Sequence, residues 1–130
     1  MDENLIEQKA MEILSWVEDA VGDMSREMHP NDIDICYGKK WAAKLKRAKA
    51  NGVTDLNGWL ADEFYSDPDI LQDLCGDRLY DAATQISGTW KDPENSLHFV
   101  AIANKMKERS HNALSKALDI LIKRREACLK

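Results

Sequence analysis

The sequence has little of the residues that mark several special classes of protein. Its 130 residues include only 6 glycines and 3 prolines, too few for a loop-rich or disordered chain. The three cysteines, Cys36, Cys75 and Cys128, are odd in number and widely spaced, which argues against a disulfide framework. No cysteine and histidine spacing typical of zinc sites occurs. We therefore expect reduced thiols in a cytoplasmic protein, with Cys75 in the core.

Long apolar runs and a secretory signal are also absent. No stretch approaches the ~18 consecutive apolar residues of a membrane-spanning helix. The first residues are acidic and lack the basic and apolar regions of a signal peptide. Apolar residues make up 44% of the chain and charged residues 32%, with a net charge of −5 at pH 7. This balance predicts one globular domain over residues 1–130 that does not bind membranes.

Signals for β-strands are missing, and helical periodicity takes their place. Apolar residues recur at alternating four- and three-residue steps over the first segment, which predicts a helix over residues 3–28. This stripe consists of Ile6, Ala10, Ile13, Val17, Ala20 and Met24. Similar patterns predict helices over 35–50, 55–65 and 68–87. Thr54 and Asp67-Pro68 are start signals, and Asn51-Gly52 and Ser87-Gly88 are stop signals.

The C-terminal segment carries one apolar stripe almost to its end. We predict a single helix from about residue 94 to 128, which would be ~50 Å long. Such a length favours a dimer, and a break near Ser110 is the alternative. The fold class expected is all-α: a bundle of about five helices with the long first and last helices packed near-antiparallel.

Charge is segregated along the chain. Residues 1–38 carry 10 acids and 2 bases, and residues 39–50 carry 6 bases and no acid. Residues 51–94 again have 10 acids and 2 bases, and residues 95–130 have 8 bases and 3 acids. In one interpretation the acidic first helix and the basic last helix pair with each other, within one chain or across a dimer. In the other, one block faces an outside partner.

Aspartates repeat every four residues in the second acidic block. A four-residue step turns only ~40° around a helix, so the row stays on one face. Repulsion along such a row costs helix stability, by roughly 0.2–0.5 kcal/mol per pair. A solvated face, contact with a basic surface and a divalent-cation site all remain open. The candidate partner-binding residues are Asp62, Glu63, Asp69, Asp73, Asp77 and Asp81.

The cation alternative is connected with a resemblance. The fragment from Asp73 to Tyr80 resembles the second acidic motif of the all-α nucleoside triphosphate pyrophosphohydrolases, and Glu18-Asp19 with Asp23 resembles their first. That family holds Mg²⁺ with carboxylates from two helices. The paired acids of each motif lie four residues apart here, whereas the family pattern has them three residues apart. The two motifs are also separated by more residues here than in that family. The resemblance implies Asp19, Asp23, Asp73 and Asp77 as Mg²⁺ ligands, which we keep as a second alternative.

The first basic block has the composition of a phosphate-binding surface. Its charged residues are Lys39, Lys40, Lys44, Lys46, Arg47 and Lys49, with further bases over 105–125. Trp41 lies within the block and Tyr37 just before it, and both are candidates for base stacking. Because Trp41 shares an apolar stripe with Leu45, however, we expect it in the core. Trp59 flanks the stripe of the following helix.

No motif for a catalytic nucleophile, phosphate loop, dinucleotide or zinc is present, so an enzyme is not favoured and no catalytic residue is assigned. The leading hypothesis is an acidic cytoplasmic protein-binding module that acts as a regulator, inhibitor or adaptor without a cofactor. That role would suit an accessory protein of a phage or mobile element. A nucleic-acid-binding protein that uses residues 39–49 and 105–125 is the first alternative.

Overall fold

The structure is a computed structural model that describes residues 2–29 and 32–129. Over these residues it has seven α-helices, one short 3₁₀ turn and no strand. The helices are α1 (Glu3–Glu27), α2 (Ile33–Tyr37), α3 (Lys39–Ala50), α4 (Leu56–Tyr65), α5 (Pro68–Ser87), α6 (Glu94–Lys107) and α7 (Asn112–Glu126), and the turn is η2 (Ala127–Leu129). The all-α class is confirmed, whereas the expected count of about five helices is too low. None of the described helices has the length and apolar character needed to cross a membrane.

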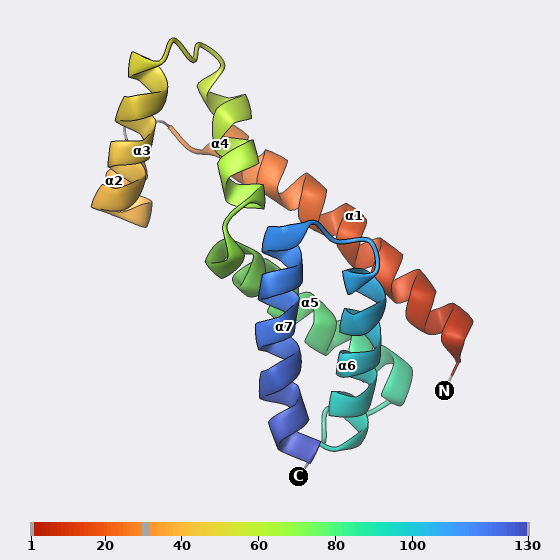
Figure 1. Ribbon diagram of the computed structural model, residues 1–130. Coiled ribbons are helices and arrows are strands. Elements are labelled where there is room, and N and C mark those ends of the chain that lie inside the picture. Colours follow the sequence, from red (N-terminus) through yellow and green to blue (C-terminus); the bar gives the residue numbers. More distant parts are fainter. Residues whose placement is uncertain (1, 30–31, 130) are drawn as a thin grey trace.

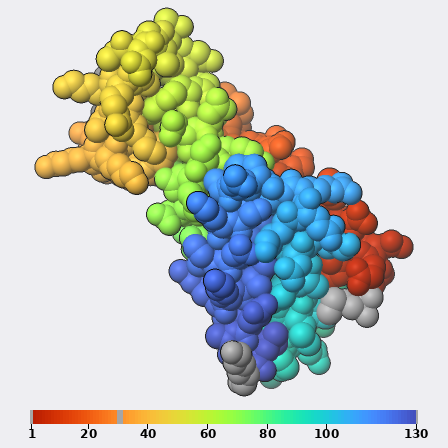
Figure 2. Space-filling view, viewed as in Figure 1, coloured from red at the N-terminus to blue at the C-terminus, as the bar shows by residue number. Residues whose placement is uncertain are grey.

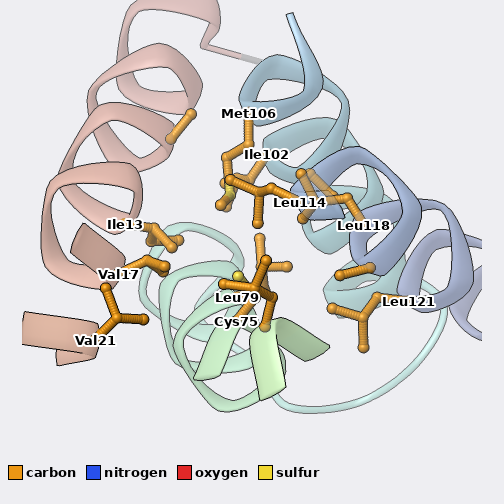
Figure 3. Packing of buried hydrophobic residues seen from close by; sticks show 14 of the residues in the cluster. Ile13, Val17, Val21, Cys75, Leu79, Ile102, Met106, Leu114, Leu118 and Leu121 are labelled. Atoms are coloured by element: carbon orange, nitrogen blue, oxygen red, sulfur yellow. The ribbon is translucent and has the colours of Figure 1, made fainter. Parts of the chain in front are cut away.

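Helix α5 is the centre of the bundle. It contacts α1, α4, α6 and α7 (Figure 1). Cys75 and Leu79 on its inner face are both 0% exposed. Figure 3 shows them between Ile13 of α1 and Leu118 of α7, with Ile102 of α6 nearby. The prediction that Cys75 is a core residue is therefore confirmed, and α1, α5, α6 and α7 all contribute to the core around it.

Helix α1 has nearly the predicted bounds, but its buried face drifts around the helix. The first four residues of the predicted stripe are buried, and then Val21 and Ser25 take the inner positions expected for Ala20 and Met24. The reason is that an α-helix has 3.6 residues per turn, so a strict 3.5-residue repeat slides off the contact face. The buried Ser25 hydroxyl is satisfied because it donates to the Gly22 carbonyl at 2.8 Å.

The predicted single helix over 94–128 is wrong, and the alternative break near Ser110 is confirmed. Helix α6 ends at Lys107 and α7 begins at Asn112. The His111 ring between them stacks on Tyr65 of α4, with 4.3 Å between ring centroids. By folding back, the chain buries Leu114, Leu118 and their neighbours against α5 and α6. A straight helix would leave these apolar side chains in water, which is the physical reason for the break.

The expected side-by-side packing of the first and last helices is also wrong. Helix α1 packs on α4, α5 and α6, whereas α7 packs on α5 and α6. Because the C-terminal segment folds back on itself, α6 and not α7 becomes the neighbour of α1 (Figure 1). The last helix is therefore short, and the length argument for a dimer no longer holds.

The predicted helix over 35–50 is divided in two. Gly38 has φ +91°, a left-handed backbone conformation that glycine adopts without steric cost. It separates α2 from α3, which pack on each other and stand off at one end of the molecule (Figure 1). We call residues 33–50 the α2–α3 arm. Aromatic rings attach the arm to α4. The ring centroid of Phe64 lies 5.1 Å from that of Tyr37 and 5.3 Å from that of Trp41.

The predicted start and stop signals of α5 mark the ends of that helix in the structure. The Asp67 carboxylate accepts the backbone N–H groups of Asp69 and Ile70 and starts α5. Gly88 ends α5 with φ +74°. Helix α4 differs slightly, because Asp55 and not the expected Thr54 accepts a backbone N–H at its start.

Candidate functional site

Four of the six predicted partner-binding acids form a continuous surface on α5. We call Asp69, Asp73, Asp77 and Asp81 the acidic strip. All four side chains are exposed, on the helix face opposite the buried Cys75. None of them forms an ion pair with any residue of the described chain. The strip therefore presents four carboxylates that form no ion pair with the described part of the chain.

The strip ends at a cleft between α1 and α5. This cleft has a volume of about 280 Å³ and is bordered by Asp81. The half-buried Trp16 lines the cleft, and the Arg78 guanidinium lies 4.0 Å from the centroid of the Trp16 ring. Lys9 of α1 and Gln85 of α5 also line the cleft, and the Lys9 ammonium donates a hydrogen bond to the Gln85 side chain at 2.8 Å. Arg78, the one base within the row, is thus occupied by an aromatic face instead of a carboxylate.

The other two predicted acids, on α4, have different surroundings. Glu63 lies 3.4 Å from the Lys44 ammonium of α3, and both side chains are about one-third exposed or less. Asp62 is exposed and borders a hollow between α1 and α4 together with Glu18 and Tyr65. Burial raises the pKa of the Tyr65 phenol, and the nearby Glu18 carboxylate adds to the shift. The predicted set of six therefore divides into the strip and two separate acids.

The six bases of α3 stay largely free of internal partners. Lys39, Lys40, Lys46, Arg47 and Lys49 are exposed, and no described residue forms an ion pair with any of the five. Lys44 alone is engaged, because it pairs with Glu63 and lies 4.6 Å from the Trp41 ring centroid. In Figure 2 the arm, coloured orange to yellow, stands away from the bundle with side chains extending from it. Its charge is therefore accessible to a ligand.

The second basic block, over 105–125, is mostly neutralised within the fold. Four of its bases have acidic neighbours: Lys105 with Glu108, Lys107 with Asp119, Arg109 with Glu7 and Arg125 with Asp92. Arg125 also lies over the Phe99 ring at 4.8 Å. Lys116, Lys123 and Arg124 remain exposed without such partners among the described residues. The two basic blocks, which look alike in sequence, therefore differ in what they offer to a ligand.

Pairing between the acidic N-terminal helix and the basic C-terminal segment is sparse. Arg109 and Glu7, 3.3 Å apart, are the one ion pair that joins them in the described part of the chain. The predicted complementarity of whole helix edges is thus reduced to a single contact. Most of the α1 acids instead face solvent.

The aromatic residues proposed for base stacking are occupied in the core. Trp41 is only 6% exposed, as expected from its stripe, and Tyr37 is half-buried against it. Trp59 of α4, which the sequence placed only beside an apolar stripe, borders a groove of about 320 Å³ next to α3. Its proximity to the basic helix depends on how α3 packs on α4, and no signal in the sequence marks it.

Metal and thiol chemistry have little support among the described residues. No group of three or more His, Cys, Asp or Glu side chains there is arranged to hold a metal ion. Asp19 and Asp23 are exposed on α1, and Asp73 and Asp77 are exposed on α5. Burial raises the pKa of the Cys75 thiol to about 12, so this cysteine is a poor nucleophile at neutral pH.

Comparisons with known proteins assign no family: no protein-family model, curated protein or solved structure matches this chain. The proposals below therefore depend on the surfaces of the chain itself.

Proposed function

We propose that this protein is a protein-binding module whose acidic strip on α5 docks a basic surface of a partner protein. The observation that carries the proposal is the exposure of all four strip carboxylates without an ion pair in the described chain. Three explanations of the row were open: a solvated face, contact with a basic surface and a cation site. Among the described residues no base of α3 forms an ion pair with the strip, and the one ion pair of α3 joins Lys44 to Glu63 of α4.

The energetics favour an external partner over a solvated face. Aspartate is a poor residue for a helix interior, and like charges four apart repel. Lysine or arginine from a partner would relieve that repulsion and would steer the partner toward the strip. The cleft beside Asp81, which the half-buried Trp16 also lines, gives such a partner a concave surface to fill.

The test is affinity capture from a nuclease-treated cell extract, with two tagged variants beside the wild type. The first reverses the charge of Asp69, Asp73 and Asp77 to lysine. The second reverses three exposed acids that lie far from the strip in sequence and lack ion pairs among the described residues: Glu3, Glu27 and Glu126. Both variants change the net charge of the protein equally. A difference in the partner that they capture therefore reports on where the reversed charges lie. Circular dichroism checks that both retain their helices.

We expect the wild type and the second variant to capture the same stoichiometric partner, and the strip variant to lose it. Equal capture by both variants would contradict docking on the strip. Recovery of only further copies of this chain would contradict a foreign partner and indicate a homo-oligomer.

A second candidate function is binding of nucleic acid by α3. The specific observation is that five of its six bases are exposed and unpaired within the described chain, on an arm that stands off from the bundle. Neutralised phosphates release counterions, so affinity should fall steeply between low and moderate salt. Retention of labelled single-stranded or duplex DNA at low salt, lost when Lys39, Lys40 and Lys46 become glutamine, would support this candidate. No retention even at low salt would exclude it.

A further inference from the structure

The groove between α3 and α4 combines an aromatic ring with positive charge. Its volume is about 320 Å³, at the lower end of the range for small-ligand sites. The lining residues are Lys44, Arg47 and Ala48 of α3, Asn51 and Val53 of the connection, and Trp59 and Glu63 of α4. We call this the Trp59 groove.

Trp59 packs partly on the core, but it differs from the other three tryptophans because no described aromatic or cationic side chain lies on its ring. Trp41 packs on Phe64, Trp16 lies under Arg78, and Trp90 has Lys91 near its ring. The half-buried Trp59 has no aromatic or cation partner, and its indole N–H has no hydrogen bond, within the described chain. A large flat ring that is fixed by packing and open to a groove is a platform for another flat ring.

Positive charge follows the groove along α3. Lys40, Lys44 and Arg47 are spaced four and three residues apart, which places them on one face of the helix. Lys44 and Arg47 both line the groove. From Lys40 to Arg47 the face extends ~10 Å along the helix axis. Because Lys44 already pairs with Glu63 at 3.4 Å, the groove's one carboxylate is neutralised and does not repel an anion.

We propose that the Trp59 groove takes an unstacked base of a single-stranded nucleic acid whose phosphates lie along Lys40 and Arg47. The inference rests on the nucleic-acid candidate above and names its ligand. The base stacks on the indole, and the Asn51 amide lies in the same groove as a donor and acceptor for the base edge. A duplex is disfavoured because its bases are stacked on each other and do not present a free face.

The experiment measures binding of a fluorescein-labelled twelve-nucleotide oligothymidylate by anisotropy over a series of salt concentrations. The same length of duplex serves as competitor. Four variants are compared with the wild type: Trp59→Ala, Trp59→Phe, Trp90→Ala and the double variant Lys40→Gln/Arg47→Gln. Trp90 is the matched control, since it is 66% exposed and lies in the loop between α5 and α6. Circular dichroism and thermal melting show whether each variant is folded.

The expected results separate stacking from charge. Trp59→Ala should weaken binding ~5- to 150-fold, the effect of losing one stacked base, and leave the salt dependence unchanged. Trp59→Phe should keep most of the affinity, and Trp90→Ala should match the wild type. Lys40→Gln/Arg47→Gln should lower the slope of log affinity against log salt by ~1.4, because two phosphate contacts to a single strand are lost. The wild type should also lose tryptophan fluorescence on binding, and Trp59→Ala should not.

Different failures have different meanings. In one outcome Trp59→Ala binds like the wild type while the double charge variant binds weakly. Helix α3 then binds nucleic acid but the groove does not hold a base, so this inference is overturned and the nucleic-acid candidate stands. If duplex competes as well as the single strand, the single-strand assignment is overturned. If the wild type does not bind at the lowest salt, both the inference and the nucleic-acid candidate are overturned.

Discussion

Replacing Phe64 by alanine should loosen the α2–α3 arm from the rest of the molecule. Phe64 is 0% exposed, and its ring contacts Tyr37 of α2 and Trp41 of α3. Helices α2 and α3 pack most closely on each other, so side chains and not close helix packing hold the arm to α4. Phe64 is the residue shared by both ring contacts.

The expected loss can be estimated from the burial and the two ring contacts. Truncation of a buried phenylalanine to alanine costs about 3–5 kcal/mol of unfolding free energy. Each aromatic pair adds roughly 0.5–1.5 kcal/mol beyond area burial, which places Phe64 in the upper half of that range. Because domains of this kind are stable by only about 5–15 kcal/mol, the change removes a large share of the total.

The assay is urea denaturation followed by circular dichroism, together with amide hydrogen exchange. Phe99→Ala is the matched control, since Phe99 is 2% exposed and packs in the main bundle on α6. Both variants should lose stability in urea. Only Phe64→Ala should give its greatest loss of exchange protection in residues 33–50.

Two results would refute this reasoning. One is a loss of less than ~1 kcal/mol for Phe64→Ala, far below the expected cost of an enclosed aromatic ring. The other is unchanged protection of residues 33–50, which would mean that contacts other than the three aromatic rings hold the arm.

Three further predictions concern single positions. Asp67→Ala should lower the free energy of unfolding in urea by about 1 kcal/mol, because two backbone N–H groups at the start of α5 lose their acceptor. Asp73→Ala should leave this free energy unchanged or raise it, because the substitution relieves repulsion within the strip. Gly88→Ala should lower the free energy of unfolding by about 1 kcal/mol, because Gly88 has φ +74°, which disfavours a side chain. Gly76→Ala should raise it by roughly 0.5–1 kcal/mol, because Gly76 lies within a helix and its new methyl would be in ordinary contact with Leu121 at 3.7 Å. Melting temperatures of the two variants that move in the same direction would contradict this pair of predictions. Cys75, with its pKa raised to about 12 and no exposed surface, should react with a thiol reagent at pH 8 only after unfolding, so rapid labelling of all three thiols in the native protein would be inconsistent with the fold.

Helix boundaries were predictable where the signal is local. Asp67-Pro68 starts α5 and Gly88 ends it as expected, because capping joins residues two to four positions apart in the chain. The breaks at Gly38 and near Ser110 were harder to locate. Both lie inside continuous apolar stripes, so periodicity alone favoured unbroken helices, and the gain from burying each half decided otherwise.

The candidate surfaces were predictable in part. Spacing alone places Asp69, Asp73, Asp77 and Asp81 on one helix face, and the structure has all four exposed. The sequence also grouped them with Glu63, which lies just upstream in the same acidic block, but Glu63 forms an ion pair with Lys44 of α3. A charge pattern identifies where charges lie on one helix but does not identify which of them another helix neutralises.

The sequence by itself determined the all-α class, the first helix, the bounds of α5, the core position of Cys75 and the row of aspartates. Each of these depends on residues within about four positions of one another, where helix geometry alone sets the neighbours. Only the tertiary structure decided that five of the six α3 bases lack an ion pair among the described residues while the C-terminal bases are mostly paired, and that Trp59, not Trp41, lines a groove. Those outcomes depend on which helices meet, and contacts between residues far apart in the chain are set by the packing of the whole core.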